Sequence, residues 1–472
     1  MLFNSISFIL FFPGVCLLYY IIPSRRIRNL FLLLSSFYFY ASLDVNYAVI
    51  LSFCILATYF GALLISKNKD TKRGKYLLFQ TVFLNSFILI IFKYFNFLGR
   101  SLNSVFQMLG FRMEIPGFDF LLPVGISFYI FKAISYIVDV YKGKINPEKD
   151  LICFSLYISF FPQLLAGPIE RAEKLIPQFK RKISFNGLNV SSGLKLMMWG
   201  FFLKLVFADR ASIYVNAVYD NINHQNGTAI LIAAILYSIQ IYCDFAGYSL
   251  ISIGAAKVMG YEVMDNFNRP YFASSITEFW KRWHISLTKW LTDYVYIPLG
   301  GSRCPKIKTY RNIMITFLVS GLWHGASWTF VIWGGIHGIV QVIERQLNLA
   351  KIQTNNKLVK SGRVFITFII VTVAWMFFRL PTFSDAMFGI YRIFTSVGMP
   401  LVNPDALPAL EYCTLSGLII FIKEYTDEYY PNRFKLYHNT NIVIRYSAYI
   451  ATCMLILAAG VFDDSQFIYM AF

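Results

Sequence analysis

Two aromatic-rich segments carry the residues whose chemistry most needs an explanation. The first reads Phe-Trp-Lys-Arg-Trp-His-Ile-Ser-Leu over residues 279–287, and the second reads Leu-Trp-His-Gly-Ala-Ser-Trp over residues 322–328. They place two of the five histidines, His284 and His324, in apolar surroundings. A histidine exchanges a proton near neutral pH, with an ordinary pKa of about 6.5, and an apolar segment tolerates it mainly where a cavity or a partner surrounds it. His324 is therefore the first candidate for proton-transfer chemistry.

The elements that position these segments are expected to be membrane helices. Hydrophobic residues make up 57% of the 472 residues and charged residues only 14%, whereas about a quarter of the residues in a soluble domain are charged. Runs of mostly apolar residues recur, for example at 3–22, 47–65, 77–98 and 121–140. We therefore predict an all-α polytopic membrane protein with about ten spans and re-entrant segments around a central tunnel, folded as a single domain over residues 1–472.

The positive charge of the chain indicates membrane topology rather than a nucleic-acid partner. The net charge is +18, and the basic residues lie in short loops between the apolar runs. Such loops are typical of cytoplasmic faces and of contact with anionic lipid. The run at 3–22 lacks a basic n-region and a cleavage site, so we interpret it as a retained span. The seven cysteines show no disulfide framework, and we predict no metal site because no metal-ligand spacing occurs.

Two apolar stretches are predicted to be broken. The stretch at 151–169 contains Pro162 and has basic patches on both sides, which indicates that it enters and leaves the membrane on one side. The same flanking pattern surrounds residues 312–343, which either form a hairpin of short helices or dip inward and return. Both alternatives put His324 near the turn of a broken element, inside the protein.

His284 belongs to a different kind of element. On a helical wheel of residues 278–293, the aromatic and leucine side chains share one face, and the charged side chains share the other. This pattern predicts an interfacial amphipathic helix. His284 falls at the edge of the apolar face, where it could line a cavity. A histidine that only reaches the interface beside Trp280 and Trp283 is the alternative.

Both histidine segments belong to an ordered series of long motifs. Asn-Phe-Asn-Arg-Pro-Tyr occupies residues 266–271, Tyr-Ile-Pro-Leu-Gly-Gly occupies 296–301, and further motifs lie upstream at 122–128, 161–169 and 244–249. Together these motifs resemble the membrane-bound O-acyltransferase family, in particular its alginate O-acetyltransferase branch, over nearly the full chain. Several long, aromatic-rich motifs in the right order make this resemblance specific.

The resemblance implies transfer of an acyl group, most often acetyl, from a cytoplasmic donor such as acetyl-CoA across a bacterial plasma membrane to a hydroxyl. In such proteins the histidine of the Trp-His-Gly motif, here His324, is taken as catalytic, and His284 matches the second characteristic histidine. His324 could act as a general base or as a nucleophile. The implied acceptors are exopolysaccharide, alginate-like polymer, cellulose or peptidoglycan. The implied partner is a separate extracytoplasmic esterase-like acetyltransferase of the SGNH type.

The remaining ionisable residues of interest have structural interpretations. Asp244 needs a partner, because an unpaired carboxylate in a span costs at least about 2.5 kcal/mol. That partner could be a cavity histidine that Asp244 orients, or an arginine that ties helices together. His337 would lie about 140° around a continuous helix from His324, so we interpret it as structural. His224 and His438 are interpreted as solvated surface residues.

Two other functions stay open at this point. A transporter or flippase would use His324 and Asp244 as a proton relay. Such a protein would be expected to have a pair of corresponding broken helices in the two halves of the chain, and the sequence does not show this pattern. Within the same family, D-alanyl transfer to teichoic acid would replace acetyl transfer. We predict no permanently bound cofactor, because acetyl-CoA or another acyl donor would be a substrate.

Overall fold

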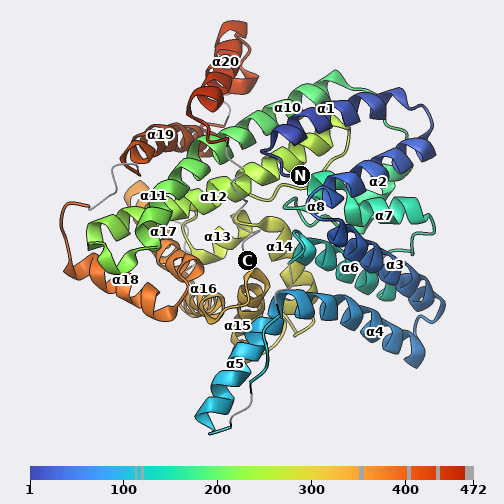
Figure 1. The fold of residues 1–472 in the computed structure, drawn as a ribbon, viewed down its shortest axis with the longest axis horizontal. Helices are drawn as coiled ribbons and strands as arrows, with labels where there is room; N and C mark the ends of the chain where they lie inside the picture. The colour runs from blue at the N-terminus through green and yellow to red at the C-terminus, as the bar shows by residue number, and fades with distance from the viewer. Residues whose placement is uncertain (112–113, 119–121, 350–355, 401–405, 432–435, 463–472) are drawn as a thin grey trace. The chain divides into compact units, whose positions relative to one another are not determined.

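All regular elements that the structure describes are helices. The structure is a computed structural model that describes residues 1–472 apart from 112–113, 119–121, 350–355, 401–405, 432–435 and 463–472 (Figure 1). No strand occurs in the described residues, which confirms the all-α prediction. The chain separates into two compact units. The first holds residues 1–192, 255–264 and 325–327, and the second holds 193–254, 265–324 and 328–472. The single domain over 1–472 stays a prediction.

The first unit is a set of packed helices from the N-terminal part of the chain. Their bounds are α1 Ile6–Ile21, α2 Arg25–Ala41, α3 Val45–Lys67, α4 Lys72–Leu89, α5 Phe95–Met108, α6 Ile126–Tyr141, α7 Leu151–Ser159, α8 Phe161–Leu164 and α9 Ala172–Lys180. A π-helical turn, η1 Ile90–Tyr94, joins α4 to α5. α3 packs against α4 and α6 (Figure 1). The apolar runs predicted at 3–22 and 47–65 form α1 and α3.

The apolar run predicted at 121–140 begins its helix later than expected. α6 starts at Ile126, after Pro123 and Gly125. Gly125 has a φ of 76°, in the left-handed region that glycine adopts without a steric penalty. This glycine turns the chain into α6, and Leu121 lies outside the described residues.

The stretch at 151–169 is broken, as the sequence predicted. α7 ends at Ser159, and the single turn α8 begins one residue later with Pro162 at its start, where a missing N–H group costs no helix bond. Lys132 of α6 donates from its Nζ to the carbonyl oxygen of Tyr157 at 3.0 Å and to Oε1 of Gln163 at 2.8 Å. A buried lysine thus binds polar groups on both sides of the break.

The second unit holds the remaining long helices. Their bounds are α10 Gly187–Phe201, α11 Asp209–Tyr219, α12 Gly227–Val258, α13 Ile276–Arg282, α14 Ile285–Leu291, α15 Lys306–His324, α16 Trp328–Gln346, α17 Lys357–Arg379, α18 Phe383–Thr395, α19 Leu407–Tyr429 and α20 Ile442–Ala459. Short π-helical or 3-10 turns are η2 Phe202–Ala208, η3 Ile222–His224, η4 Pro270–Phe272, η5 Thr292–Tyr296 and η8 Leu436–His438. The ends of α10 and α12, residues 187–192 and 255–258, belong to the first unit.

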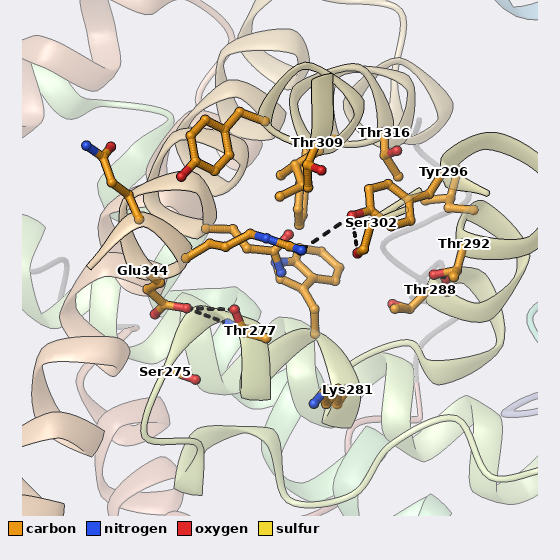
Figure 2. Close-up of a pocket in the computed structure, with 18 of the residues that line it drawn as sticks. Ser275, Thr277, Lys281, Thr288, Thr292, Tyr296, Ser302, Thr309, Thr316 and Glu344 are labelled. Atoms are coloured by element: carbon orange, nitrogen blue, oxygen red, sulfur yellow. Dashed lines mark hydrogen bonds between the residues drawn. The ribbon is translucent and has the colours of Figure 1, made fainter. Parts of the chain in front are cut away.

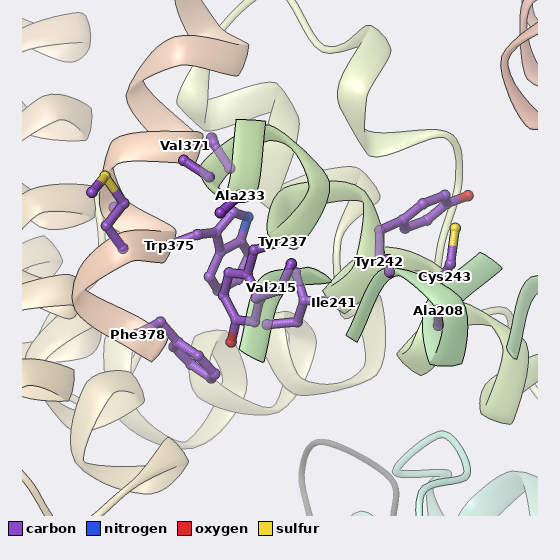
Figure 3. Packing of buried hydrophobic residues seen from close by; sticks show 14 of the residues in the cluster. Ala208, Val215, Ala233, Tyr237, Ile241, Tyr242, Cys243, Val371, Trp375 and Phe378 are labelled. Atoms are coloured by element: carbon purple, nitrogen blue, oxygen red, sulfur yellow. The ribbon is translucent and has the colours of Figure 1, made fainter. Parts of the chain in front are cut away.

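An aromatic core fills the second unit. Trp375 of α17 belongs to the same buried cluster as Tyr237 and Ile241 of α12 (Figure 3). Its ring stacks on that of Trp333, with centroids 5.5 Å apart, and lies 5.0 Å from the ring of Trp283. Buried aromatic side chains remove about 150–250 Å² each from solvent, so this cluster is a major source of the unit's packing energy.

Helices α15 and α16 form a tight antiparallel hairpin (Figure 1). A Cβ atom on Gly321 would lie 2.3 Å from the carbonyl oxygen of Phe330, and one on Gly334 would lie 2.3 Å from the carbonyl oxygen of Phe317. Small residues allow two helix backbones to approach this closely. Of the two alternatives for residues 312–343, the hairpin is therefore correct, although each of its helices has 19 residues and is not short.

Replacing Gly334 with alanine should destabilise this hairpin. The new methyl group would meet backbone atoms that cannot move aside, and overpacking of this kind costs about 1–3 kcal/mol. We expect a lower apparent melting temperature for purified Gly334→Ala in detergent. Gly335→Ala is the matched control, because its Cβ would meet nothing nearer than Leu318 Cδ2 at 4.0 Å. Equal melting temperatures for the two variants would contradict close packing of α15 against α16.

Several helices are suited to a membrane. Among the described residues, six helical stretches are long and apolar enough to cross a bilayer, judged by length and composition: Val45–Lys67, Lys72–Met108, Gly187–Tyr219, Gly227–Val258, Lys357–Arg379 and Ile442–Ala459. α1 is a shorter apolar helix of 16 residues. The count of about ten spans stays a prediction.

Candidate functional site

The segment around His284 is a broken element and not one interfacial helix, so the prediction for residues 278–293 is wrong. α13 ends at Arg282 and α14 begins at Ile285. His284 lies between them with a φ of 42°, an uncommon left-handed conformation for a residue with a side chain. Trp283 and His284 are both 0% exposed. The prediction assumed one continuous helix whose apolar face lies at the membrane interface. In the structure, aromatic side chains of the protein itself cover that face.

Asn266 stabilises the break by accepting hydrogen bonds from the first residues of α14. The backbone N–H of Ile285 donates to the carbonyl oxygen of Asn266 at 2.9 Å. The side-chain oxygen of Asn266 accepts from the backbone N–H of Ser286 at 3.2 Å and from its hydroxyl at 2.9 Å. These bonds satisfy groups at the start of α14 that a continuous helix would have satisfied internally. Asn266 thus replaces the missing helix bonds.

The structure brings the two predicted histidines together. His324 is the last residue of α15 and is 2% exposed. The centroids of the His284 and His324 rings lie 6.5 Å apart. Trp323 contacts both rings edge-on, at 5.7 Å from His284 and 4.9 Å from His324, and Trp333 lies 4.9 Å from His324. Both imidazoles are therefore buried side by side among aromatic rings of the second unit.

Burial keeps His284 neutral. Its side chain lies outside the six candidate spans, and burial lowers the pKa of the imidazole to about 3. At pH 7 the ring therefore carries one proton and one lone pair, which is the form that can accept a proton.

The other predicted histidines lie apart from this pair or serve packing. His337 is fully buried, and its Nδ1 accepts a hydrogen bond from Trp280 Nε1 at 3.3 Å, which agrees with its structural interpretation. His224 lies exposed in the turn η3, as predicted. The side chain of His438 lies outside the described residues.

A cavity of about 910 Å³ lies among α13, α14, η5, α15 and α16. Its polar wall is shown in Figure 2, where Glu344 points toward Thr277. Oε2 of Glu344 accepts from the backbone N–H of Thr277 at 2.9 Å and from its hydroxyl at 2.8 Å. The cavity reaches Ser320, one helical turn before His324, but neither His324 nor His284 lines it. This cavity thus ends short of both histidines, and the central tunnel stays a prediction.

An ion cluster fixes α13 to α19. Arg282 donates to both carboxylate oxygens of Glu428, at 2.9 and 3.1 Å, and to Glu278 at 2.7 Å. Arg269 donates to Glu428 at 2.7 Å. Burial opposes ionisation of Glu278, yet hydrogen bonds from Ser274 and the charge of Arg282 hold the pKa of its carboxyl below the ordinary value. The cluster therefore anchors α13, which ends two residues before His284.

Asp244 has a lysine partner, so both partners suggested for it were wrong. The Nζ of Lys204 lies 2.7 Å from Oδ1 of Asp244 and 2.7 Å from Oδ1 of Asp209. Lys204 is 1% exposed and lies in the π-helical segment η2. The triad ties η2 and α11 to α12, which fits the helix-tying role proposed from the sequence but with lysine in place of arginine.

Several residues of the site were not predicted from the sequence. Lys204 interrupts the apolar run Phe201–Ala208, and a lysine in such a run signals a buried acidic partner. Asn266 opens a motif that was recognised but was given no role of its own. Among the described residues, no three His, Cys, Asp or Glu side chains gather as metal ligands would.

These features define a class of protein before any comparison with relatives. An all-helical chain with several helices long enough to span a bilayer, and with a buried histidine pair, is typical of a multi-pass membrane enzyme. The chain belongs to the membrane-bound O-acyltransferase family, whose profile matches residues 35–383. It is therefore a multi-pass membrane protein and an O-acyltransferase, and the transporter alternative is no longer needed.

Three relatives show which kinds of transferase the chain resembles. A probable alginate O-acetylase AlgI from Pseudomonas putida is 38% identical over 418 residues, which cover 88% of this chain and 85% of that protein. A peptidoglycan O-acetyltransferase from Helicobacter pylori is 33% identical over 418 residues, covering 82% of this chain and 78% of that protein. A teichoic acid D-alanyltransferase from Bacillus subtilis is 28% identical over 236 residues, covering 48% of this chain and 59% of that protein.

Proposed function

We propose that this chain moves an acetyl group from acetyl-CoA at the cytoplasmic face of a bacterial plasma membrane to hydroxyl groups of an extracytoplasmic polysaccharide, with His324 and His284 as its catalytic residues. The observation that carries this proposal is the pair of buried imidazoles, 6.5 Å apart, together with a cavity of about 910 Å³ that reaches the helix of His324. Relatives named for acetylation of alginate and of peptidoglycan cover most of the chain, which supports a polysaccharide acceptor.

The chemistry requires one proton acceptor near the scissile thioester. In one route His324 removes the proton of the acceptor hydroxyl, the oxygen attacks the thioester carbonyl, and coenzyme A leaves as a thiol with that proton. In the other route a nitrogen of His324 attacks the thioester carbonyl, and coenzyme A leaves as a thiol with the ring proton. The hydroxyl oxygen then attacks the acetyl group on His324, the bond to nitrogen breaks, and the hydroxyl proton returns to the imidazole. Both routes need a neutral imidazole in a site without bulk water, and the aromatic walls around His324 supply such a site.

The 910 Å³ cavity is the proposed donor site. Its volume falls in the range of about 300–1,000 Å³ that small-molecule and cofactor pockets occupy. Three basic residues, Lys281, Lys306 and Arg345, belong to its lining and are exposed, so their charges can meet the phosphates of coenzyme A. The cavity extends to Ser320, so the acetyl end of a bound donor would lie within about one helical turn of His324.

Removing two of these charges should weaken donor binding without slowing the chemical step. We expect the double variant Lys281→Ala/Lys306→Ala to raise the KM for acetyl-CoA by about tenfold, which corresponds to about 1.4 kcal/mol, at a nearly unchanged kcat. Lys289→Ala is the matched control, because Lys289 is an exposed lysine of α14 outside the cavity lining. An unchanged KM in the double variant would rule out these lysines as phosphate ligands.

The acceptor can be identified in cells. Surface polymers would be purified from a deletion strain with and without the wild-type gene, and both base-labile acetate and D-alanine esters would be measured. Return of acetate to one polysaccharide supports the proposal and names the acceptor. Return of D-alanine alone would favour teichoic acid D-alanylation, for which the relative from Bacillus subtilis is the supporting observation.

A separate protein is expected to complete the transfer. The family resemblance favours an extracytoplasmic esterase-like acetyltransferase of the SGNH type as the partner. Co-purification of such a protein with the tagged chain from its native membrane would support this part of the proposal.

A further inference from the structure

Asn266 makes contacts that determine which nitrogen of the His284 imidazole carries the proton. Its side chain is 1% exposed. Its Oδ1 accepts from the backbone N–H of Ser286 at 3.2 Å and from the Ser286 hydroxyl at 2.9 Å, while its Nδ2 donates to Oγ of Ser249 at 3.2 Å. A backbone N–H can only donate, so the oxygen of the amide must be the atom that faces α14. The orientation of the Asn266 amide is therefore determined by its surroundings.

This orientation decides which nitrogen of His284 carries the proton. Nδ1 of His284 lies 3.1 Å from Oδ1 of Asn266. Because Oδ1 offers only lone pairs, Nδ1 must supply the hydrogen atom of this bond. In a neutral imidazole the other nitrogen, Nε2, then holds the lone pair. A histidine with the opposite tautomer would lose this bond and would place two lone pairs against each other.

Asn266 also holds the backbone of His284 in place. Its carbonyl oxygen accepts from the N–H of Ile285 at 2.9 Å, and the N–H of Asn268 donates to the carbonyl oxygen of Arg282 at 2.9 Å. The segment before α13 thus pairs with residues on both sides of His284. The left-handed conformation of His284 persists because these bonds determine it from outside the helix.

We propose that Asn266 is a positioning residue for acyl transfer, which holds His284 in the tautomer with hydrogen on Nδ1 and the lone pair on Nε2, the form in which His284 can assist His324 as a proton acceptor. This inference rests on the proposed catalytic role of His284. Asn266 touches neither donor nor acceptor in this scheme and acts only through the imidazole.

The groups around His284 make its protonation sensitive to a new charge at position 266. The ring of Phe245 from α12 lies 4.6 Å from that of His284, and the titratable ring of His324 from α15 lies 6.5 Å from it. Asp244 on α12 is paired with Lys204. Arg282 on α13 is paired with Glu278 and Glu428, and Lys289 on α14 is exposed.

Asn266→Asp gives the sharpest test of this role. A carboxylate keeps an acceptor for all three bonds and adds a negative charge facing Nδ1, which raises the pKa of a neighbouring imidazole by about 1–3 units. His284 should then become protonated at moderately acidic pH. Because the pKa of His284 starts at about 3, a rise of about two units brings it to about 5. We therefore expect the ratio of the acyl-transfer rate at about pH 4.5 to that at about pH 7.5 to fall about fourfold in this variant relative to wild type.

Asn266→Ala tests the orientation of the His284 imidazole without adding a charge beside it. It removes the acceptor without adding charge, so the transfer rate should fall at least about tenfold at both pH values, with no change in their ratio. Asn85→Ala is the matched control. It removes an equally buried asparagine from α4, where Asn85 donates to the carbonyl oxygen of Thr81 at 2.9 Å, far in sequence from the histidines. It should leave the transfer rate near the wild-type value at both pH values.

The outcomes distinguish this inference from the proposed function. If His284→Ala is inactive but Asn266→Asp keeps the wild-type pH ratio, the positioning role is overturned and the proposed function stands. If His284→Ala transfers acetyl at the wild-type rate, the proposed role of His284 fails, and this inference fails with it. If Asn266→Ala does not accumulate in membranes, Asn266→Asp decides alone, because it preserves the three acceptor contacts.

Discussion

His324→Ala is expected to lower the rate of acyl transfer by about 100- to 10,000-fold, which is the range that a positioned general base contributes. The loss follows from the position of His324 at the end of α15, where its ring is 2% exposed and faces His284 across 6.5 Å. The same ring also lies 4.9 Å from that of Trp333. The measurement is the initial rate of label transfer from acetyl-labelled coenzyme A to base-labile ester in membranes that hold matched amounts of protein.

The matched control for this variant is His337→Asn. His337 is also buried and aromatic-walled, but its Nδ1 serves as an acceptor for Trp280, and an asparagine oxygen can accept the same bond. This variant should keep its transfer rate within about tenfold of wild type, since no proton-transfer step is assigned to it. Equal losses in the two variants would mean that burial of any histidine in this core is required for folding, and the assignment of His324 would lose its support.

Lys204→Met is expected to have the largest effect on stability. Lys204 Nζ lies 2.7 Å from both Asp209 and Asp244, and all three side chains are at most 5% exposed. Removing the cation leaves two buried carboxylates close together without their counter-charge, a change that costs about 3–5 kcal/mol. The apparent melting temperature in detergent should fall on the order of 5–10 °C.

Two further variants make this result specific to the buried triad. Lys195→Met removes a half-exposed lysine of α10 whose ammonium lies over the ring of Tyr449, and it should change the melting temperature little. Adding Asp209→Asn and Asp244→Asn to Lys204→Met removes the uncompensated charges and should recover much of the loss. A Lys204→Met protein that melts like wild type but cannot transfer acyl groups would contradict the structural role and would point to proton transfer through the triad.

The helical fold and the histidine pair were predictable from the sequence because they depend on features that are local in the chain. Long apolar runs determine where α1 and α3 lie, and proline with glycine determines where the stretch at 151–169 breaks. Basic patches on both sides of residues 312–343 indicated an element that turns back, and the turn follows His324 directly. The motifs around His284 and His324 were specific enough to indicate the family.

The features that the sequence did not reveal depend on bonds between distant residues. The charge pattern of residues 278–293 fits a continuous helix, but the break at His284 is stabilised by Asn266, which lies 18 residues earlier. The partner of Asp244 lies 40 residues before it, in a π-helical turn that has no sequence signature of its own. Patterns along one element predict its buried face, but they do not predict which polar groups on other elements meet it there.

The most direct test of the central claim follows the acetyl group itself. Inside-out membrane vesicles would be prepared from a deletion strain that carries either the wild-type protein or His324→Ala at matched levels, and acetyl-labelled coenzyme A would be added outside. If His324 catalyses the transfer, we expect base-labile label on polysaccharide inside the vesicles with the wild-type protein and at least about 100-fold less with His324→Ala. Equal internal label with both proteins would contradict the account, because acetyl groups would then cross and be esterified without the residue at its centre.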